Sequence, residues 1–291
     1  MTIYAPKLYA EVIGDPIAHS KSPMIHRHWL DAAGITADYR ATHVRPDELA
    51  AFFAGRRDDP DWRGCNVTIP HKQTAMPLLD SIDPAAERIG AINTVVPRDG
   101  RLIGYNTDYA GFLAPLQPLL RQQHLFRMAR IFGAGGAARA IALALHDQGF
   151  TIVFGARNLD QARELRAAFD KDGTPDETLM AHLDHFADPI DFPWDDRVGI
   201  LDLVVNATSL GMKGKPPLRL DFSHVPPNSV VYDAVYAPLE TPLLAEARAK
   251  GLRTIDGLEM LIGQAAVAFE HFFGVPAPRG GDAALRERLG A

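Results

Sequence analysis

The chain has 291 residues, of which 47% are hydrophobic and 23% charged, and a formal net charge of −6. This composition excludes a disordered chain, which has too little apolar surface to offset its ordering entropy. No apolar run approaches the roughly 20 residues that span a bilayer, and the N-terminus lacks a secretion signal. We therefore expect a cytoplasmic protein without a membrane partner.

The charge and the cysteine content argue against nucleic-acid binding and against a disulfide or metal-binding protein. An acidic chain repels phosphate backbones, so we expect no nucleic-acid partner. The one cysteine, Cys65, excludes an intrachain disulfide and a thiolate zinc site. His26 and His28 are two apart and face different sides of a predicted helix, so we expect no metal. Any anion site has to be made locally, by a few basic side chains or helix N-termini.

The first third of the chain alternates apolar runs with helix signals. The apolar runs predict strands at 8–13, 39–44, 65–69, 93–96 and 101–105, the last two joined as a hairpin through 98–100. Helices are predicted at 22–33, at 47–54 and after Asp83-Pro84. Ser22 is the expected N-cap of the first helix, with Pro23 in its first turn.

The middle of the chain repeats a strand–helix pattern. Strands are predicted at 128–132, 150–154, 201–206 and 229–233, with helices from the glycine-rich turn to about 148 and at 160–169. Residues 170–198 are acidic and interrupted by prolines, which indicates a surface connection. Strands that alternate with helices predict an α/β fold with a mostly parallel sheet.

The last part of the chain is predicted to be helical. Apolar residues recur at helical spacing over 258–273, so this helix has to pack its apolar stripe on a folded domain. We expect it to return to the first domain. The predicted organisation is a first domain at 1–110, a second at 111–256, and C-terminal helices at 257–291 that rejoin the first.

A dinucleotide-binding pattern lies between a predicted strand and a predicted helix. Gly133 permits the tight turn, Gly135 lets the backbone approach a pyrophosphate, and Ala138 allows close packing of helix on strand. The phosphates would lie on the helix N-terminus. The alternative is a glycine-rich turn that closes an ordinary strand–helix unit, but a second strand–helix unit in register favours nucleotide binding.

The end of the second strand in this region indicates which dinucleotide binds. An NAD site usually has an acidic residue there, which holds the ribose 2′-hydroxyl. This chain has Arg157 instead, whose guanidinium can bind a 2′-phosphate. We therefore predict NADP over NAD, with an ordinary surface arginine as the alternative.

Hydride transfer requires a group that exchanges a proton with the substrate. Lys72 directly follows a predicted strand, where open α/β sheets bind ligands, and Asp108 is a carboxylate that could hold it in place. The alternatives are a solvated lysine and an aspartate that caps a helix. His71 competes with Lys72 for the role of base.

Ser20 and Ser22 flank the start of the first predicted helix. Their hydroxyls and the helix N–H groups can converge on a carboxylate. Capping by Ser22 would explain one serine and leave Ser20 without a role.

Eight segments, in order, resemble the shikimate dehydrogenase family: VIGDPIAHSKSPMIH, GCNVTIPHK, GAINTV, GYNTDYAGF, GAGGAARA, NATSLGM, YDAVYAPLETPLL and DGLEMLIGQAA. The resemblance covers nearly the whole chain. It implies NADP-dependent interconversion of 3-dehydroshikimate and shikimate, a step toward chorismate and the aromatic amino acids. It also implies an N-terminal substrate domain and a Rossmann-type NADP domain separated by a cleft.

The resemblance implies a role for each matching position. Ser20 and Ser22 would bind the substrate carboxylate, and Lys72 and Asp108 would form the catalytic pair. Further substrate contacts are implied for Thr68, Asn93, Tyr236 and Gln264. The cofactor would contact Gly133, Ala134, Gly135, Gly136, Ala137, Arg157, Ala234 and Gly257.

The chain departs from the family at two cofactor positions. Family members that use NADP often have Asn-Arg-Thr-x-x-Arg, where this chain retains only the first arginine in 156–161. Ala234 stands where the family often has methionine. Two alternative functions remain: an NAD-dependent quinate/shikimate dehydrogenase of catabolic type, and a non-catalytic nucleotide-binding regulator. The protein is expected to be a monomer or a homodimer.

Overall fold

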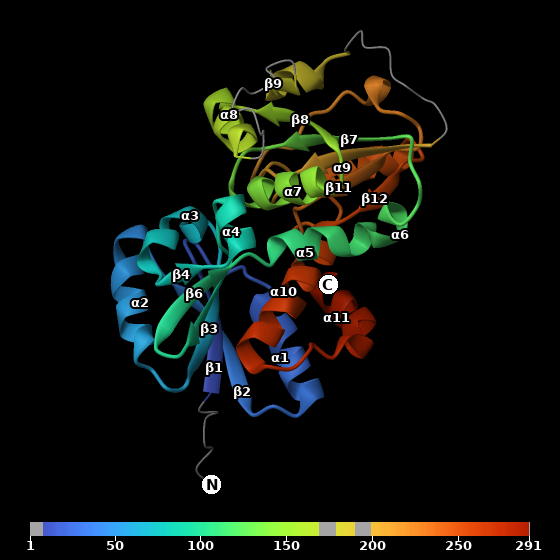
Figure 1. Ribbon diagram of the computed structural model, residues 1–291. Coiled ribbons are helices and arrows are strands. Elements are labelled where there is room, and N and C mark those ends of the chain that lie inside the picture. Colours follow the sequence, from blue (N-terminus) through green and yellow to red (C-terminus); the bar gives the residue numbers. More distant parts are fainter. Residues whose placement is uncertain (1–7, 169–178, 190–198, 291) are drawn as a thin grey trace. The chain divides into compact units, whose positions relative to one another are not determined.

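The structure is a computed structural model that describes residues 8–168, 179–189 and 199–290 (Figure 1). The chain divides into two compact units. Unit 1 comprises Met1–Gly111 and Ile262–Ala291, and unit 2 comprises Phe112–Leu261. Each unit has its own six-stranded sheet with helices, so the predicted α/β fold class is confirmed.

The sheet of unit 1 has the strand order β2-β1-β3-β5-β6-β4. Its strands are β1 (Leu8–Gly14), β2 (Ala37–His43), β3 (Trp62–Val67), β4 (Ser81–Ile82), β5 (Thr94–Arg98) and β6 (Arg101–Tyr105). β1 is parallel to β2 and β3, whereas β5 is antiparallel to β3 and β6. The β5–β6 turn has positive φ at Asp99 and Gly100, as a two-residue hairpin of type I′ requires, so the predicted hairpin is confirmed.

The helices of unit 1 surround this sheet. They are α1 (Ser22–Ala33), α2 (Leu49–Arg57), α3 (His71–Thr74), α4 (Pro84–Ile89), α5 (Asp108–Leu113) up to Gly111, α10 (Gly257–Phe273) from Ile262, and α11 (Asp282–Gly290). Short 3-10 helices lie at Pro46–Glu48, Met76–Leu78 and Arg279–Gly281. β1 is almost entirely buried, which explains why its residues are apolar except for Glu11, whose buried carboxylate pairs with Arg56.

The late helix packs its aromatic residues inside unit 1. Phe269 of α10 is fully buried, and its ring lies edge-on to that of Trp29 of α1, with 5.8 Å between the ring centroids. The ring centroids of Phe272 and of Tyr39 in β2 are 6.3 Å apart. The segment from Ile262 onward therefore completes a core that the first 111 residues begin.

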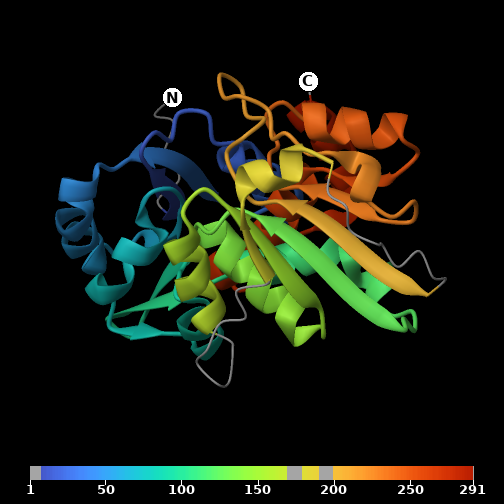
Figure 2. The same cartoon turned by 90° about the horizontal axis from the view of Figure 1, so that it is seen from above.

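Unit 2 has the strand order β12-β11-β10-β7-β8-β9, and every neighbouring pair is parallel. Its strands are β7 (Phe126–Phe132), β8 (Thr151–Ala156), β9 (Met180–His182), β10 (Ile200–Asn206), β11 (Val230–Asp233) and β12 (Arg253–Ile255). Its helices are α6 (Gln117–Leu120), α7 (Gly136–Asp147), α8 (Leu159–Ala167) and α9 (Pro242–Ala249), with 3-10 helices at Ala114–Leu116, Leu183–Ala187 and Phe222–His224. Figure 2 shows the green and orange strands of this sheet side by side.

The predicted strands and helices have ends within three residues of those in the structure, with three corrections. Lys21, not Ser22, is the N-cap of α1, because the Lys21 carbonyl accepts the first helical hydrogen bonds. The predicted connection at 170–198 includes the edge strand β9; its residues 170–178 and 190–198 lie outside the described residues. The elements β4, α6, α9 and β12 were not predicted, whereas α11 lies within the C-terminal stretch 257–291 that was predicted to be helical. Among the described residues, no helix combines the length and apolarity of a membrane span.

His26 makes the stability of unit 1 depend on pH. Its ring is fully buried and stacked on Tyr39 at 3.9 Å, and neither ring nitrogen has a hydrogen-bond partner among the described residues. Burial lowers the pKa of His26 to about 3, from an ordinary value near 6.5. Between these values the unfolded chain binds a proton that the folded chain does not, so stability falls as pH falls below 6.5.

From pH 6.5 to 5 this group alone should remove about 1–2 kcal/mol of stability. We expect the wild-type free energy of unfolding to fall by about 1–2 kcal/mol more than that of His26→Phe over this interval. Urea unfolding at both pH values, followed by tryptophan fluorescence, measures the difference. Equal losses in the two proteins would contradict the assignment.

Candidate active site

Several polar segments of unit 1 begin at one edge of its sheet. β1 and β3 are parallel, so both end at this edge, where β5 begins and β6 ends. The segments that meet there carry the predicted side chains Ser20, Ser22, Thr68, Lys72, Asn93 and Asp108. The grouping of these segments at one edge of the sheet thus has a simple topological cause.

Lys72 and Asp108 form a hydrogen-bonded ion pair. The Lys72 ammonium donates to Oδ2 of Asp108, and the two side chains are only 14% and 7% exposed. The Ile92 N–H donates to the Lys72 carbonyl at 2.8 Å, which ties the short helix α3 to the segment before β5. A largely desolvated ammonium with a fixed carboxylate partner is suited to exchange a proton with a bound ligand.

The Asp108 carboxylate does not cap its helix. The Asp108 N–H donates to Oδ1 of Asn106 at 3.0 Å, so the Asn106 side chain accepts the hydrogen bond at the start of the helix. The carboxylate instead accepts from Lys72 through Oδ2 and from Nδ2 of Asn93 through Oδ1, the latter at 2.9 Å. The capping alternative for Asp108 is therefore wrong.

Asn93 connects Asp108 to helix α10. Its Nδ2 also donates to Oε1 of Gln264 at 3.3 Å, and both side chains are buried. A Cβ at Gly111 would lie 2.5 Å from the Gln264 backbone nitrogen, so this close approach requires a glycine in α5. The structure thus brings together four of the predicted residues: Lys72, Asn93, Asp108 and Gln264.

His71 does not take part in this cluster. Its ring is fully buried, and Nε2 lies 2.7 Å from the carbonyl oxygen of Val44. Lys72, one residue further along α3, makes the contact with Asp108 instead. The arrangement favours Lys72 over His71 as the proton-exchanging group.

The two serines have different environments. The Ser22 N–H donates to Oγ of Ser20 at 3.3 Å, while the Ser22 hydroxyl has no hydrogen-bond partner among the described residues. The ammonium of Lys21, between them, donates to the Leu289 carbonyl near the end of α11. Thr68 follows β3, and its Cγ2 lies beside Gly14, the last residue of β1, where a Cβ would be 2.6 Å away.

The glycine-rich turn of unit 2 fits a pyrophosphate. Gly133 has φ +116, and Gly135 is the N-cap of α7 without a side-chain cap. Among the described residues, no atom lies within 4 Å of a Cβ built on Gly135, so the helix start is open to a ligand. Ala138 is fully buried, as close packing of helix and strand requires. Ala134, Gly136 and Ala137 complete the turn and the first residues of α7.

The end of β8 presents Arg157 to solvent. The next residue, Asn158, caps α8 by accepting from the N–H groups of Asp160 and Gln161 at 3.0 and 3.3 Å. Gln161 stands where the family often has its second arginine. Arg157 is therefore the one basic residue of 156–161 that could meet a 2′-phosphate.

Ala234 and Gly257 lie together in unit 2, since a Cβ at Gly257 would be 2.5 Å from the Ala234 carbonyl oxygen. Tyr236 belongs to the same segment, and burial raises the pKa of its hydroxyl. Asp233 joins the ends of β10 and β11 by accepting from Asn206 at 2.9 Å and from Thr241 at 2.7 Å. Burial raises the pKa of Asp233 to about 6.

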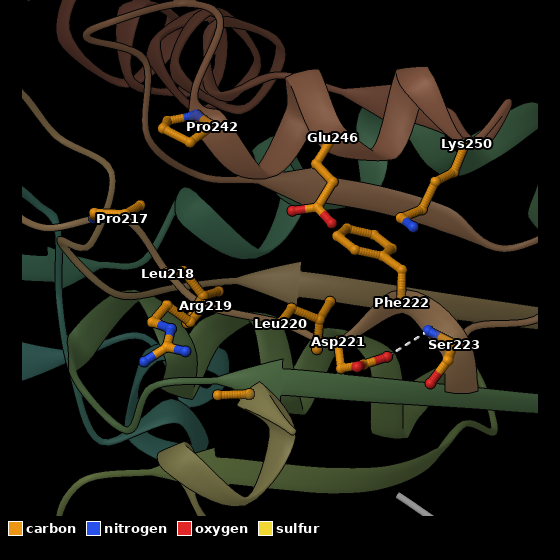
Figure 3. A pocket seen from close by; sticks show the side chains of 11 residues that line it. Pro217, Leu218, Arg219, Leu220, Asp221, Phe222, Ser223, Pro242, Glu246 and Lys250 are labelled. Carbon is orange, nitrogen blue, oxygen red and sulfur yellow. Dashed lines mark hydrogen bonds between the residues drawn. The ribbon is translucent and has the colours of Figure 1, made fainter. Parts of the chain in front are cut away.

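A separate pocket of about 530 Å³ lies in unit 2 (Figure 3). It is lined by the segment 217–223, by Ala187, and by Pro242, Glu246 and Lys250 of α9. Figure 3 shows Glu246 and Lys250 pointing toward the ring of Phe222. None of the predicted site residues lines it, and its charged side chains carry both signs, so it forms no part of the candidate site.

Four buried polar residues near Asn93 were not predicted: Tyr39, Asn66, Thr94 and Thr107. Their hydroxyl and amide groups bond to one another and to Asn93. The available signal was a polar residue between apolar neighbours in a strand, as at Asn66 between Cys65 and Val67 of β3.

Substitution of Ser22 tests whether its hydroxyl has a structural role. The hydroxyl neither caps α1 nor bonds a described residue, so Ser22→Ala should change the free energy of unfolding by less than about 0.5 kcal/mol. Asp83→Ala is the matched control, because Asp83 does cap α4 and its loss should cost about 1 kcal/mol. Urea unfolding measures the free energy of unfolding of both variants. An equal loss of this free energy in the two would show that Ser22 stabilises α1.

Comparison with known proteins identifies the family. A family model of the shikimate dehydrogenase substrate binding domain matches residues 12–95, and one of the shikimate 5'-dehydrogenase C-terminal domain matches residues 257–281. A shikimate dehydrogenase (NADP(+)) of Sphingopyxis alaskensis is 50% identical over 284 residues, covering 97% of this chain and 96% of that protein. One of Azorhizobium caulinodans is 43% identical over 283 residues, covering 96% and 94%.

A solved structure gives the same result. Shikimate 5-dehydrogenase of Thermus thermophilus, crystallised in complex with NADP(H) and shikimate, is 34% identical with a TM-score of 0.80. The match covers 97% of this chain and 99% of that one. The chain belongs to the shikimate dehydrogenase family.

Proposed function

We propose that the protein is an NADP-dependent shikimate dehydrogenase, which interconverts 3-dehydroshikimate and shikimate on the route to chorismate and the aromatic amino acids. The observation that carries this proposal is the desolvated pair of Lys72 and Asp108, held by Asn93 and Gln264, in a chain of this family. Shikimate bears a carboxylate and ring hydroxyls, which match a site with serine hydroxyls at one end and this polar cluster at the other.

Unit 1 would bind the substrate. The hydroxyls of Ser20 and Ser22 bind the carboxylate, consistent with a Ser22 hydroxyl that has no partner among the described residues. Thr68, Asn93 and Gln264 contact the ring hydroxyls or the carboxylate. Tyr236 of unit 2 adds one further contact.

Lys72 would exchange the proton. In the direction of reduction, the Lys72 ammonium protonates the ketone oxygen of 3-dehydroshikimate as it becomes a hydroxyl. In the direction of oxidation, the neutral Lys72 amine accepts the proton of that hydroxyl. Asp108 holds the Lys72 side chain in place and accepts a bond from a substrate hydroxyl. Asn93 fixes the Asp108 carboxylate, so the reacting groups are positioned before the substrate arrives.

Unit 2 would bind NADP through residues that fit it. The open N-terminus of α7, with Gly133, Ala134, Gly135, Gly136 and Ala137, meets the pyrophosphate, and Arg157 meets the 2′-phosphate. Ala234 and Gly257 lie close to the nicotinamide. The bound cofactor supplies or accepts the hydride of the reaction.

Assay of both substrates with both cofactors tests this function. The wild-type protein should oxidise shikimate with NADP⁺ more efficiently than with NAD⁺, and more efficiently than it oxidises quinate. A preference for quinate with NAD⁺ would indicate a catabolic enzyme, and nucleotide binding without turnover would indicate a regulator.

In titrations with each reduced cofactor, Arg157→Ala should weaken NADPH binding by about 1.5–3 kcal/mol, roughly 10- to 150-fold, and leave NADH binding unchanged. The matched control is Arg163→Ala, which removes an arginine that pairs with Asp160 on α8. Equal losses for both cofactors would mean that Arg157 does not bind the 2′-phosphate.

Removal of the Lys72 amine tests its role in proton exchange. Lys72→Ala should lower kcat by about 10²- to 10⁴-fold and change KM much less, because a positioned acid–base contributes on this scale. Lys250→Ala, which removes an exposed lysine of unit 2, is the control and should retain normal turnover. A Lys72→Ala protein with near-normal kcat would refute the assignment.

A further inference from the structure

A chain of buried hydrogen bonds runs behind Asn93 in unit 1. The Tyr39 hydroxyl donates to Oδ1 of Asn66 at 2.5 Å, and Nδ2 of Asn66 donates to the Thr94 hydroxyl at 3.0 Å. The Thr94 hydroxyl in turn donates to Oδ1 of Asn93 at 3.0 Å. Tyr39 and Thr94 are fully buried, and the two asparagines are at most 5% exposed.

Groups of fixed polarity set the direction of this chain. The Thr107 N–H can only donate, and it meets Oδ1 of Asn93 at 2.7 Å. The Asp108 carboxylate accepts, and it meets Nδ2 of Asn93 at 2.9 Å. The Asn93 amide therefore has one orientation, and the Thr94 hydroxyl makes its shorter bond to Oδ1, at 3.0 Å compared with 3.5 Å to the Thr107 hydroxyl.

The far end of the chain is fixed in the same way. Nδ2 of Asn66 also donates to the backbone carbonyl of Asn93 at 3.2 Å, which leaves Oδ1 of Asn66 to accept from Tyr39. Every donor from Tyr39 to Asn93 thus points toward Asp108. Aligned hydrogen bonds in a buried environment polarise and strengthen one another.

The Thr94 hydroxyl is the link that joins this chain to the Asn93 side chain. Without it, Oδ1 of Asn93 loses one of its donors, and Nδ2 of Asn66 loses one of its two acceptors. The Asn93 amide is then held less firmly, and so is the Asp108 carboxylate that it positions against Lys72. Small displacements of positioned groups lower reaction rates considerably.

We propose that Thr94 is a positioning residue for the dehydrogenase reaction: its hydroxyl, backed by Asn66 and Tyr39, orients the Asn93 amide that holds Asp108 against Lys72. The inference rests on the proposed function. A purely structural role for Thr94 would lower stability but leave the kcat of the folded protein unchanged.

Thr94→Val and Thr94→Ser distinguish these roles, since valine keeps the shape of threonine without its hydroxyl and serine keeps the hydroxyl. The kcat of Thr94→Val for shikimate oxidation with NADP⁺ should fall about tenfold, the usual effect of one lost hydrogen bond. Thr94→Ser should retain kcat within about twofold of wild type. Both should bind NADP⁺ with unchanged Kd, and thermal melting confirms that each is folded.

Tyr39→Phe is the second variant, which serves if Thr94→Val does not fold. It keeps the ring that stacks on His26 and removes only the outermost hydroxyl, so kcat should fall about threefold. The inference is overturned, and the proposed function is not, if folded Thr94→Val keeps the wild-type kcat or if Thr94→Ser loses as much kcat as Thr94→Val. Where Thr94→Val does not fold, a wild-type kcat in Tyr39→Phe has the same meaning. A wild-type protein that binds NADP⁺ but does not oxidise shikimate overturns the proposed function and the inference with it.

Discussion

The ion pair between Lys72 and Asp108 is the interaction on which the site in unit 1 depends. Two charges that are only 14% and 7% exposed lose most of their hydration, and their mutual attraction compensates only when the geometry is good and the remaining polar atoms are bonded. Asn93 meets this requirement by donating to the second oxygen of Asp108. The polar residues around the pair therefore follow from the cost of burying it.

The C-terminal part of the chain joins this polar cluster through Gln264 of α10. Gln264 of α10 approaches Asn93 only because Gly111 and Gly263 let α5 and α10 come close, with a Cβ at Gly263 only 3.0 Å from Gly111. The aromatic residues further along α10 then bury themselves against α1 and β2. One helix thus serves both the hydrophobic core and the polar cluster.

Much of this arrangement was predictable from the sequence because its signals are local. Apolar runs located the longer strands, glycine spacing located the turn before α7, and Lys72 and Asp108 each follow a strand. The N-cap of α1 was misplaced because a serine before a proline matches the capping pattern one residue too late. β9 and β12 have three residues each, too few to show a periodicity. The links from Tyr39 to Asn66 and from Asn66 to Thr94 join residues 27 and 28 positions apart, which no local pattern reveals.

The proposed reaction requires the Lys72 amine to exchange the proton of the reacting hydroxyl. A crystal structure of the protein with shikimate and NADP⁺ bound would show where that amine lies. We expect Nζ of Lys72 within hydrogen-bonding distance, about 2.7–3.2 Å, of the shikimate oxygen that becomes the ketone, while still bonded to Asp108. An amine turned toward bulk solvent and far from that oxygen would contradict this expectation.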